Sequence, residues 1–286
     1  MVGRDMDFAL DKMVTLAREV SVRGVGLHSG VGAEVVLRPR REGGVVLRRA
    51  DVSGGEFRLR PELVQASPLC TLLENDEGAT LSTVEHLLAA LHGLRVDSVD
   101  VEIQGPEVPI LDGSALPWVA LIDEAGRVEL DRPRDWLRVP SPQVLDSEGR
   151  VLLANPEPRT GLRVECVVDF PHPKIGRQEW KGVVDEASFR TDIAPARTFV
   201  LERDIAAAQA AGLAKGGSLD NAVVFGDNGE VLNPGGLRFA DEPVRHKVLD
   251  VVGDLFMAGR CVSGIFAMTA PGHVANNRLL RKIVAG

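Results

Sequence analysis

Hydrophobic and polar residues follow two different periods in the first half of the chain. Between residues 82 and 94 the apolar positions recur at helical spacing, at Val84, Leu87, Leu88, Leu91 and Leu94. The flanking segments are rich in β-branched residues and are separated by glycine or proline, which is typical of strands. The predicted elements are strands over 13–22, 33–37, 45–49 and 98–103, and helices over 82–94 and 114–125.

The second half repeats this mixture after a segment typical of a linker. Residues 131–142 contain three prolines and five charged residues between two periodic regions. Beyond them the pattern predicts strands over 151–154, 162–170, 222–225 and 262–268, and helices over 202–211, 243–258 and 276–284. Strands and helices alternate without the spacing of a βαβ array, and no GxGxxG or GxxxxGK[ST] motif follows a strand. This pattern favours an α+β fold in two layers and argues against a nucleotide-cofactor enzyme.

Length, composition and charge are those of a globular protein without a basic face. The chain has 286 residues, of which 44% are hydrophobic and 26% charged, and this length favours two domains. The formal net charge is −8, so no surplus of cations is available for a nucleic-acid-binding surface. Any anionic partner must then be met by a few individually placed cations.

Cysteine usage and the N-terminus bear on the cellular compartment. Cys70, Cys166 and Cys261 lie far apart in apolar stretches and form neither a disulfide framework nor a CxxC metal site. We interpret them as buried thiols in a reducing compartment. No segment reaches the roughly 18 consecutive apolar residues of a membrane helix, so no transmembrane segment is expected. Residues 1–16 mix acidic and basic side chains without a secretory signal, and we expect a cytoplasmic location.

The helix predicted over 243–258 carries the most informative polar residues. At about 100° per residue, His246, Asp250 and Asp254 share one narrow stripe opposite an apolar face. An imidazole and a carboxylate one turn apart can bind the same ion, and a catalytic zinc takes three protein ligands and keeps one position for water. An ordinary amphipathic helix with a polar outer side explains the same stripe. The segment alone leaves both interpretations open.

The beginning of the helix over 82–94 also admits two interpretations. Glu85 stands three residues after Ser82, which is the capping-box spacing, so a helix-capping role explains it by itself. His86 points away from the apolar stripe and has this carboxylate as its neighbour. A zinc hydrolase needs such a pair, because the histidine holds the ion while the carboxylate takes a proton from water. The HExxH pattern is absent, since His92 follows six residues later.

Three further histidines stand in turn-like sequences. His273 follows Pro271-Gly272 at a predicted strand-to-helix corner, where a rigid scaffold can present a catalytic side chain. His28 lies in a glycine-rich turn, and His172 lies between two prolines in a segment that could be plain surface. A single histidine in such a place is more often structural than catalytic.

Short motifs follow one another in a fixed order from about residue 13 to the C-terminus. They are Gly24-Val25-Gly26-Leu27-His28-Ser29-Gly30, Thr83-Val84-Glu85-His86-Leu87, Glu107-Val108-Pro109-Ile110-Leu111-Asp112-Gly113-Ser114, Ala196-Arg197-Thr198-Phe199, Gly216-Gly217-Ser218, Val231-Leu232-Asn233, Gly236-Leu237-Arg238-Phe239, His246-Lys247 through Asp254, and Gly272-His273 before Asn276-Asn277. This series resembles the UDP-3-O-acyl-N-acetylglucosamine deacetylase family, which comprises zinc enzymes of lipid A synthesis in Gram-negative bacteria.

The resemblance implies a metal site and a general base. His86, His246 and Asp250 are implied as the ligands of Zn²⁺, which lowers the pKa of its water to about 7. Glu85 is implied as the base that takes the proton of this water while the oxygen attacks the acetamide carbonyl.

Three other residues receive roles in the same reaction. The hydroxyl of Thr198 would stabilise the oxyanion together with zinc. His273, as imidazolium, would hydrogen-bond the intermediate and protonate the departing amine. Asp254 would orient His273 and hold its positive charge.

The implied substrate is a UDP-linked acyl amino sugar. Lys247 is assigned to its diphosphate and Phe170 to the region near the uridine, and Phe199 is placed at the substrate site with them. Residues 202–221 match the insert that forms the family's hydrophobic passage for the acyl chain. The same small apolar residues would suit plain helix packing.

The resemblance also implies two similar sheet-plus-helices domains packed together, with the active site between them. We expect an N-terminal α+β domain over 1–130, a linker over 131–142 and a C-terminal α+β domain over 143–286, in a monomer. The leading hypothesis is zinc-dependent hydrolysis of the N-acetyl group of UDP-3-O-acyl-N-acetylglucosamine. The alternatives are a zinc amidase acting on another acetamido sugar and a non-catalytic relative.

Overall fold

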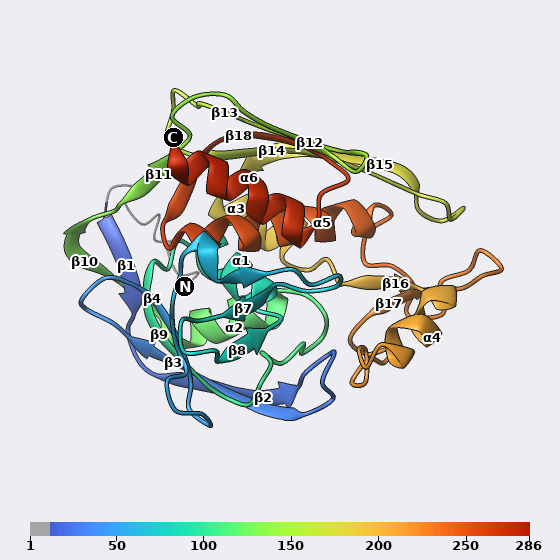
Figure 1. Ribbon diagram of the computed structural model, residues 1–286, viewed down its shortest axis with the longest axis horizontal. Coiled ribbons are helices and arrows are strands. Elements are labelled where there is room, and N and C mark those ends of the chain that lie inside the picture. Colours follow the sequence, from blue (N-terminus) through green and yellow to red (C-terminus); the bar gives the residue numbers. More distant parts are fainter. Residues whose placement is uncertain (1–11) are drawn as a thin grey trace, which may run out of the picture.

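The computed structural model describes residues 12–286, and Figure 1 shows two large sheets with helices between them. Residues 1–11, which carry most of the argument against a secretory signal, lie outside the described residues. The helices are α1 (Glu85–Gly93), α2 (Leu116–Ala125), α3 (Glu186–Ser188), α4 (Glu202–Ala210), α5 (Glu242–Leu255) and α6 (His273–Ala285), with the short turns η1 (Pro61–Leu63), η2 (Phe189–Ile193) and η3 (Phe256–Ala258). None of the helices in residues 12–286 is both long and apolar enough to cross a membrane.

The first sheet is built from the N-terminal half around strand β9. Its strands are β1 (Lys12–Leu16), β2 (Val20–Val25), β3 (Gly32–Pro39), β4 (Gly44–Arg49), β5 (Glu56–Arg58), β9 (Ser98–Gln104) and β10 (Arg127–Pro133). Strand β9 pairs antiparallel with β3 and parallel with β4. Its buried Val99, Val101 and Ile103 alternate with less buried acidic residues, so one face of the sheet belongs to the core.

The second sheet comes from the C-terminal half and is centred on β18. Its strands are β11 (Trp136–Arg138), β12 (Gln143–Ser147), β13 (Arg150–Asn155), β14 (Leu162–Phe170), β15 (Gly176–Val184) and β18 (Cys261–Thr269). Strand β18 pairs antiparallel with β13 and parallel with β14. The last strand of the chain, β18, thus lies between β13 and β14, which precede it by about a hundred residues in the sequence.

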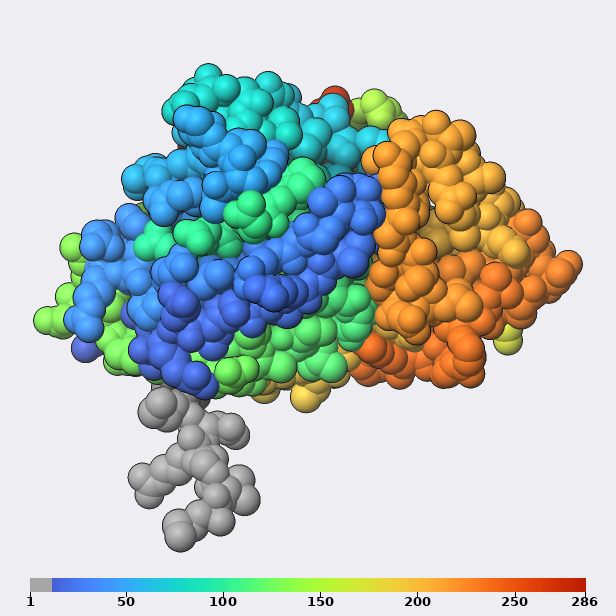
Figure 2. Space-filling view, turned by 90° about the horizontal axis from the view of Figure 1, so that it is seen from below, coloured from blue at the N-terminus to red at the C-terminus, as the bar shows by residue number. Residues whose placement is uncertain are grey.

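Two small sheets complete the fold. One contains β6 (Val64–Gln65), β7 (Leu72–Glu74) and β8 (Thr80–Ser82), and β8 leads directly toward α1. The other is the parallel pair β16 (Phe199–Leu201) and β17 (Val223–Phe225). With α4 this pair forms a lobe at one side of the molecule (Figure 1). In the space-filling view the lobe, in orange, lies beside the blue and green N-terminal half (Figure 2).

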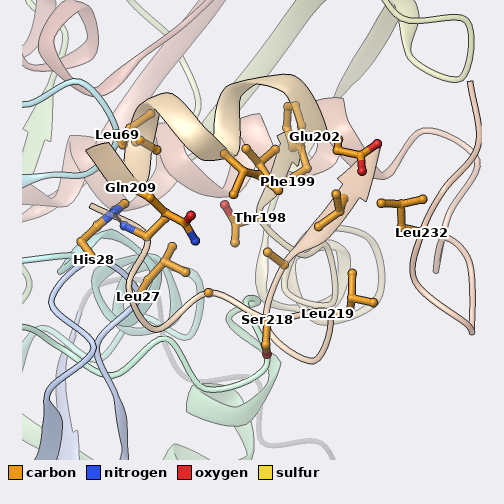
Figure 3. Close-up of a pocket in the computed structure, with 17 residues that line it drawn as sticks. Leu27, His28, Leu69, Thr198, Phe199, Glu202, Gln209, Ser218, Leu219 and Leu232 are labelled. Atoms are coloured by element: carbon orange, nitrogen blue, oxygen red, sulfur yellow. Dashed lines mark hydrogen bonds between the residues drawn. The ribbon is translucent and has the colours of Figure 1, made fainter. Parts of the chain in front are cut away.

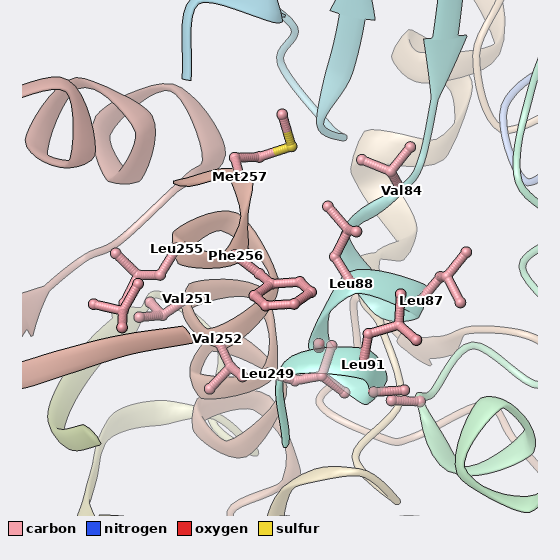
Figure 4. Packing of buried hydrophobic residues seen from close by; sticks show 14 of the residues in the cluster. Val84, Leu87, Leu88, Leu91, Leu249, Val251, Val252, Leu255, Phe256 and Met257 are labelled. Atoms are coloured by element: carbon pink, nitrogen blue, oxygen red, sulfur yellow. The ribbon is translucent and has the colours of Figure 1, made fainter. Parts of the chain in front are cut away.

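The helices of the two halves meet in the middle of the molecule. In Figure 1, α1 and α2 lie on the side of the first sheet and α5 and α6 on the side of the second, and α1 packs directly against α5. Figure 4 shows Leu88 and Leu91 of α1 facing Phe256, the first residue of η3 directly after α5, and all three are fully buried. Burying each such side chain contributes about 1.5–3 kcal/mol. This contact therefore fixes α1 relative to α5.

The observed architecture confirms the predicted α+β fold with two sheet-plus-helix units. Strand β10 ends at Pro133 on the first sheet, and β11 begins at Trp136 on the second. The end of β10 overlaps residues 131–142 and β11 lies within them, so the predicted linker contributes residues to each sheet. We propose the division into domains at 1–130 and 143–286, because the chain passes from one sheet to the other between these strands.

Several elements differ from the sequence prediction; for example, the strand predicted over 13–22 is divided between β1 and β2. Two of the differences have a clear physical reason. The helix predicted over 82–94 begins only at Glu85, because Thr83 has a φ of 60°. A β-branched residue rarely adopts this left-handed conformation, so the sequence gives no warning of the turn. Strand β15 is not predicted at all, because Trp180 is its only buried residue and it lies at the sheet edge. An edge strand of this kind has no apolar period.

Gly253 permits the close approach of α5 to α1. A Cβ atom at this position would lie 2.1 Å from the carbonyl oxygen of Glu85 and 3.2 Å from the backbone nitrogen of Ala89. Neither backbone atom can move without displacing α1. We expect Gly253→Ala to lower the free energy of unfolding by about 1–3 kcal/mol, the typical cost of overpacking a core, measured by urea denaturation.

Gly235→Ala is the matched control for this prediction. A Cβ atom there has no neighbour within 4 Å, and the residue is not in the left-handed region. The control should unfold like the parent chain. If both glycine variants have the parent's stability, the two helices can separate at no cost and the close contact does not constrain them.

Candidate active site

The polar residues singled out in the sequence come together where α1, α5 and α6 meet. Glu85 and His86 are the first two residues of α1, and His273 is the first residue of α6. His246 and Asp250 lie one turn apart on α5, with Asp254 on the following turn. Apart from His273, which is slightly more exposed, all of them are buried. The first sheet unit supplies two of these side chains and the second supplies the others.

His86, His246 and Asp250 form a group that could hold a metal ion. One ligand atom from each residue lies within 4.8 Å of the others. Asp250 Oδ1 is 3.4 Å from His246 Nε2 and 3.9 Å from His86 Nε2. The two imidazole rings stand edge to face with centroids 4.9 Å apart.

The hydrogen bonds around this group leave suitable donor atoms free. His246 Nδ1 lies 3.0 Å from the carbonyl oxygen of Ala196, which leaves its Nε2 facing the group. Lys247 Nζ donates to Asp250 Oδ2 at 2.7 Å, while Asp250 Oδ1 is buried without a hydrogen-bond partner. A buried carboxylate oxygen without a donor is costly unless a cation completes it. The arrangement therefore fits a metal held by two nitrogens and one oxygen.

The protonation states of these ligands also suit a metal. Burial and the neighbouring imidazole of His246 lower the pKa of His86 to about 3. Burial likewise lowers the pKa of His246, although Asp250 opposes this shift. Burial disfavours ionised Asp250, but the Lys247 ammonium and nearby histidines outweigh it and hold its pKa below the usual range. At neutral pH the site thus presents two neutral imidazoles and one carboxylate, the forms that bind metals.

Glu85 and His273 form a second pair next to the metal group. Glu85 Oε1 lies 3.8 Å from His273 Nε2. Burial raises the pKa of Glu85 to about 7, although the charge of His273 opposes the shift. Burial disfavours the His273 imidazolium, but Asp254, 3.0 Å from Nδ1, outweighs it and raises the pKa to about 10. One group can therefore accept a proton near neutral pH and the other can donate one.

The capping interpretation of Glu85 is wrong. Ser82 belongs to β8, the residue preceding α1 is Val84, and no side chain caps this helix. Glu85 Oε2 instead accepts the backbone N–H of Thr71 at 3.2 Å. The left-handed turn at Thr83 rotates the chain out of the capping geometry and directs the carboxylate toward His273. The interpretation of α5 as a helix with a solvated polar stripe is also wrong, since His246, Asp250 and Asp254 are buried.

An apolar cavity of about 310 Å³ lies beside Thr198 (Figure 3). Its lining comes from three parts of the chain, namely the turn at Leu27 and His28, the loop at Leu69, and the region from Thr198 to Leu232 that includes α4. The insert is attached to the turn by backbone hydrogen bonds from Gly216 N–H to Leu27 and from Lys215 N–H to His28. Residues 202–221, singled out in the sequence as a hydrophobic passage, thus contribute one wall of an actual cavity.

Two aromatic rings and a lysine lie close together near the metal group, and one of the rings, Phe199, also lines the cavity. The Phe199 ring lies 5.2 Å from the Phe170 ring and 6.4 Å from the His246 ring. Lys247 Nζ is 5.7 Å from the centre of the Phe199 ring. The three residues assigned to the substrate are therefore close to one another.

The remaining histidines and cysteines have structural surroundings. His172 is buried, with its ring Nε2 3.0 Å from the Gly226 carbonyl oxygen, so the interpretation as plain surface is wrong. His92 lies on α1 but bonds to the backbone of Val252 and Val262, away from the metal group. The three cysteines are buried and free, as predicted.

Sequence reasoning missed the side chains that hold Asp254. The Thr71 hydroxyl donates to Asp254 Oδ1 at 2.6 Å, and the Asn276 amide donates to Oδ2 at 2.8 Å. Asn276 stands in a matched motif, which could have drawn attention to it. Thr71 carries no sequence signal, because it is separated from Asp254 by 183 positions.

Comparisons with known proteins identify the family of the chain. The family model for LpxC, UDP-3-O-acyl N-acetylglycosamine deacetylase, matches residues 13–285. The UDP-3-O-acyl-N-acetylglucosamine deacetylase of Aliivibrio fischeri is 44% identical over 275 residues, covering 95% of this chain and 89% of its own length. The protein of that name from Phenylobacterium zucineum is 44% identical over 266 residues, with 92% and 89% covered.

A third relative of the same name, from Shewanella loihica, is 42% identical over 275 residues, covering 95% of this chain and 89% of its own length. Identity at this level along nearly the whole length implies a shared fold, and the family match includes every residue of the metal group and of the acid and base pair. The chain belongs to the UDP-3-O-acyl N-acetylglycosamine deacetylase family.

Proposed function

We propose that the chain hydrolyses the N-acetyl group of UDP-3-O-acyl-N-acetylglucosamine, releasing acetate and the free amine in a step of lipid A synthesis. The observation that carries this proposal is the meeting of a metal-ligand group, a base, an acid and an apolar cavity at one place. The names of the relatives supply the substrate. A cytoplasmic location and a monomeric state stay predictions.

The metal is proposed to be Zn²⁺, held by His86, His246 and Asp250. Two imidazoles and one carboxylate are a usual ligand set for a catalytic zinc with a position left for water. When bound, zinc lowers the pKa of a water molecule to about 7 and polarises the carbonyl oxygen. The Ala196 carbonyl, 3.0 Å from His246 Nδ1, keeps the proton on that nitrogen and orients the ring.

Glu85 takes a proton from the attacking water, and His273 gives a proton to the departing amine. Glu85, with its pKa raised to about 7, accepts a proton from the attacking water. His273, held as imidazolium by Asp254, donates a proton to the amine nitrogen, which cannot leave as an anion. The 3.8 Å between Glu85 Oε1 and His273 Nε2 lets both reach one small acetamide group.

Thr198 supplies the remaining polar contact. Its side chain lines the cavity next to Phe199, and Figure 3 shows it among the lining residues. There its hydroxyl can donate to the oxygen of the acetyl group as negative charge develops. Its N–H donates to the Gly113 carbonyl at 2.7 Å, which fixes the position of this residue.

The substrate is proposed to lie between the aromatic cluster and the insert. Lys247 contacts the diphosphate, and Phe170 and Phe199 offer apolar faces to the nucleoside and the sugar. The acyl chain occupies the cavity lined by Leu27, Ile205 and Leu232 together with other apolar residues. This arrangement lets a chain of net charge −8 bind a dianionic substrate without a basic surface.

Acetate release from substrates with and without the acyl chain tests the proposal. Each buried methylene contributes about 0.8 kcal/mol, so a long acyl chain should raise kcat/KM by at least about 100-fold. Equal rates would favour an amidase acting on another acetamido sugar. If the zinc-loaded protein releases acetate from neither substrate, the chain is a non-catalytic relative.

A further inference from the structure

Thr71 lies just before β7 and hydrogen-bonds both to Glu85, the proposed base, and to Asp254, the partner of the proposed acid His273. Its side chain is 2% exposed, and its hydroxyl donates to Asp254 Oδ1 at 2.6 Å. Its backbone N–H donates to Glu85 Oε2 at 3.2 Å. Its carbonyl oxygen accepts the N–H of Thr83 at 3.0 Å, next to the left-handed turn that begins α1. One residue thus joins the base on α1 to the carboxylate on α5.

Three hydrogen-bonding groups hold the carboxylate of Asp254, namely those of Thr71, His273 and Asn276. Oδ1 accepts the Thr71 hydroxyl and Oδ2 accepts the Asn276 amide at 2.8 Å, while His273 Nδ1 lies 3.0 Å from Oδ2 and 3.2 Å from Oδ1. Thr71 and Asn276 donate to different oxygens, so rotation of the carboxylate would lengthen at least one of these two bonds. Each of these bonds involves a charged acceptor, and such bonds are stronger than bonds between neutral groups. The Thr71 hydroxyl therefore sets the orientation in which Asp254 meets His273.

We propose that Thr71 is a positioning residue for the deacetylation, holding Glu85 and the Asp254–His273 pair at a fixed separation. This inference rests on the proposed function, in which Glu85 is the base and His273 the acid. Thr71 belongs neither to the metal-ligand group nor to the cavity lining, and its side-chain and N–H hydrogen bonds go to Asp254 and Glu85, so we expect its effect to reach the reaction through these two residues.

The geometry of the acid and base explains why such a link matters. Glu85 and His273 come from different helices, and their reacting atoms are 3.8 Å apart. A displacement of about 1 Å in a catalytic group can cost on the order of 100-fold in rate. Loss of a hydrogen bond that orients a site residue typically costs about 10–100-fold. A defect at Thr71 should therefore reduce kcat rather than substrate binding.

The test compares Thr71→Val, which replaces the hydroxyl by a methyl group of similar size, with Thr71→Ser, which keeps the hydroxyl and lacks the methyl group. We expect Thr71→Val to lower kcat by at least about 10-fold, with KM changed less than about twofold and one zinc still bound. Thr71→Ser should keep near-parent kcat, because its hydroxyl can still donate to Asp254. The matched control is Thr15→Val, since Thr15 is also buried, lies on β1 of the first sheet and accepts the Arg40 backbone N–H with its hydroxyl oxygen. This control should keep the parent kcat.

A second arm tests whether the effect passes through Asp254. In an Asp254→Asn background, Thr71→Val should cause less than about a twofold further loss, because residues that act as one unit are not additive. Full additivity would overturn the inference, and so would parent-like kcat in Thr71→Val or equal losses in the serine and valine variants. If the valine variant does not fold, Thr71→Ala takes its place in both arms.

The same data separate this inference from the proposed function. If Glu85→Gln and His273→Ala turn over like the parent, the assignment of base and acid fails, whatever Thr71 does. If both collapse while Thr71→Val keeps its kcat, the proposed function stands and only the positioning role is lost.

Discussion

Glu85→Gln is expected to lower kcat by about 10²–10⁴-fold, the usual contribution of a general base, while the protein keeps one zinc per chain. Glutamine has the same shape as glutamate but cannot accept the proton of the attacking water. Its side-chain oxygen can still accept the Thr71 N–H, which now reaches Glu85 Oε2 at 3.2 Å. The measurements are steady-state acetate release and metal analysis of the same sample.

Glu85→Ala separates charge from shape in this experiment. It should lose turnover to a similar extent and also retain the metal, because Glu85 is outside the group of His86, His246 and Asp250. Near-parent kcat in either variant would show that Glu85 does not take the proton. Loss of zinc in both variants would instead place Glu85 among the groups that hold the ion.

His246→Ala is expected to weaken zinc binding by more than about 100-fold, since even residues that only orient a ligand contribute about 10–100-fold. Acetate release should disappear with the metal. His246 is one of three ligand candidates, and within residues 12–286 no imidazole besides those of His86 and His246 belongs to this group. Metal titration by calorimetry and acetate release of the zinc-saturated protein check the two parts of the prediction.

His92→Ala is the matched control for His246→Ala. His92 is a buried histidine on α1, six residues after His86, and its ring bonds to the Val252 carbonyl and the Val262 N–H. Its removal leaves these backbone groups unpaired and should cost about 1–3 kcal/mol of stability, but the zinc should remain bound. Full activity of the parent protein after exhaustive chelation would contradict the metal's role altogether.

Much of the site was predictable because its signals are local in the sequence. The spacing of His246, Asp250 and Asp254 puts them on one stripe of a helix, and the adjacency of Glu85 and His86 is visible directly. These patterns depend only on helical geometry. They do not show whether the stripe faces water or protein. The structure does, because Asp250 and Asp254 are buried in the folded chain.

The tertiary structure decided what each local pattern does. Glu85 has the spacing of a capping residue, yet the left-handed Thr83 turns it toward His273, which lies 188 positions later in the chain. Gly253 has no sequence signal as a contact residue, but it lets α5 come close enough to α1 for ligands from both helices to form one group.

By itself, the sequence determined the helices and strands with strong periods, the α+β class, the motif series of the deacetylase family and the polar stripe of α5. Only the tertiary structure decided that Glu85 is not a cap, that Thr71 joins Glu85 to Asp254, and that the insert walls a cavity. The physical reason is range. Periodicity and spacing reflect interactions within a few residues, whereas the meeting of helix ends depends on how two sheet units bury their apolar faces against each other.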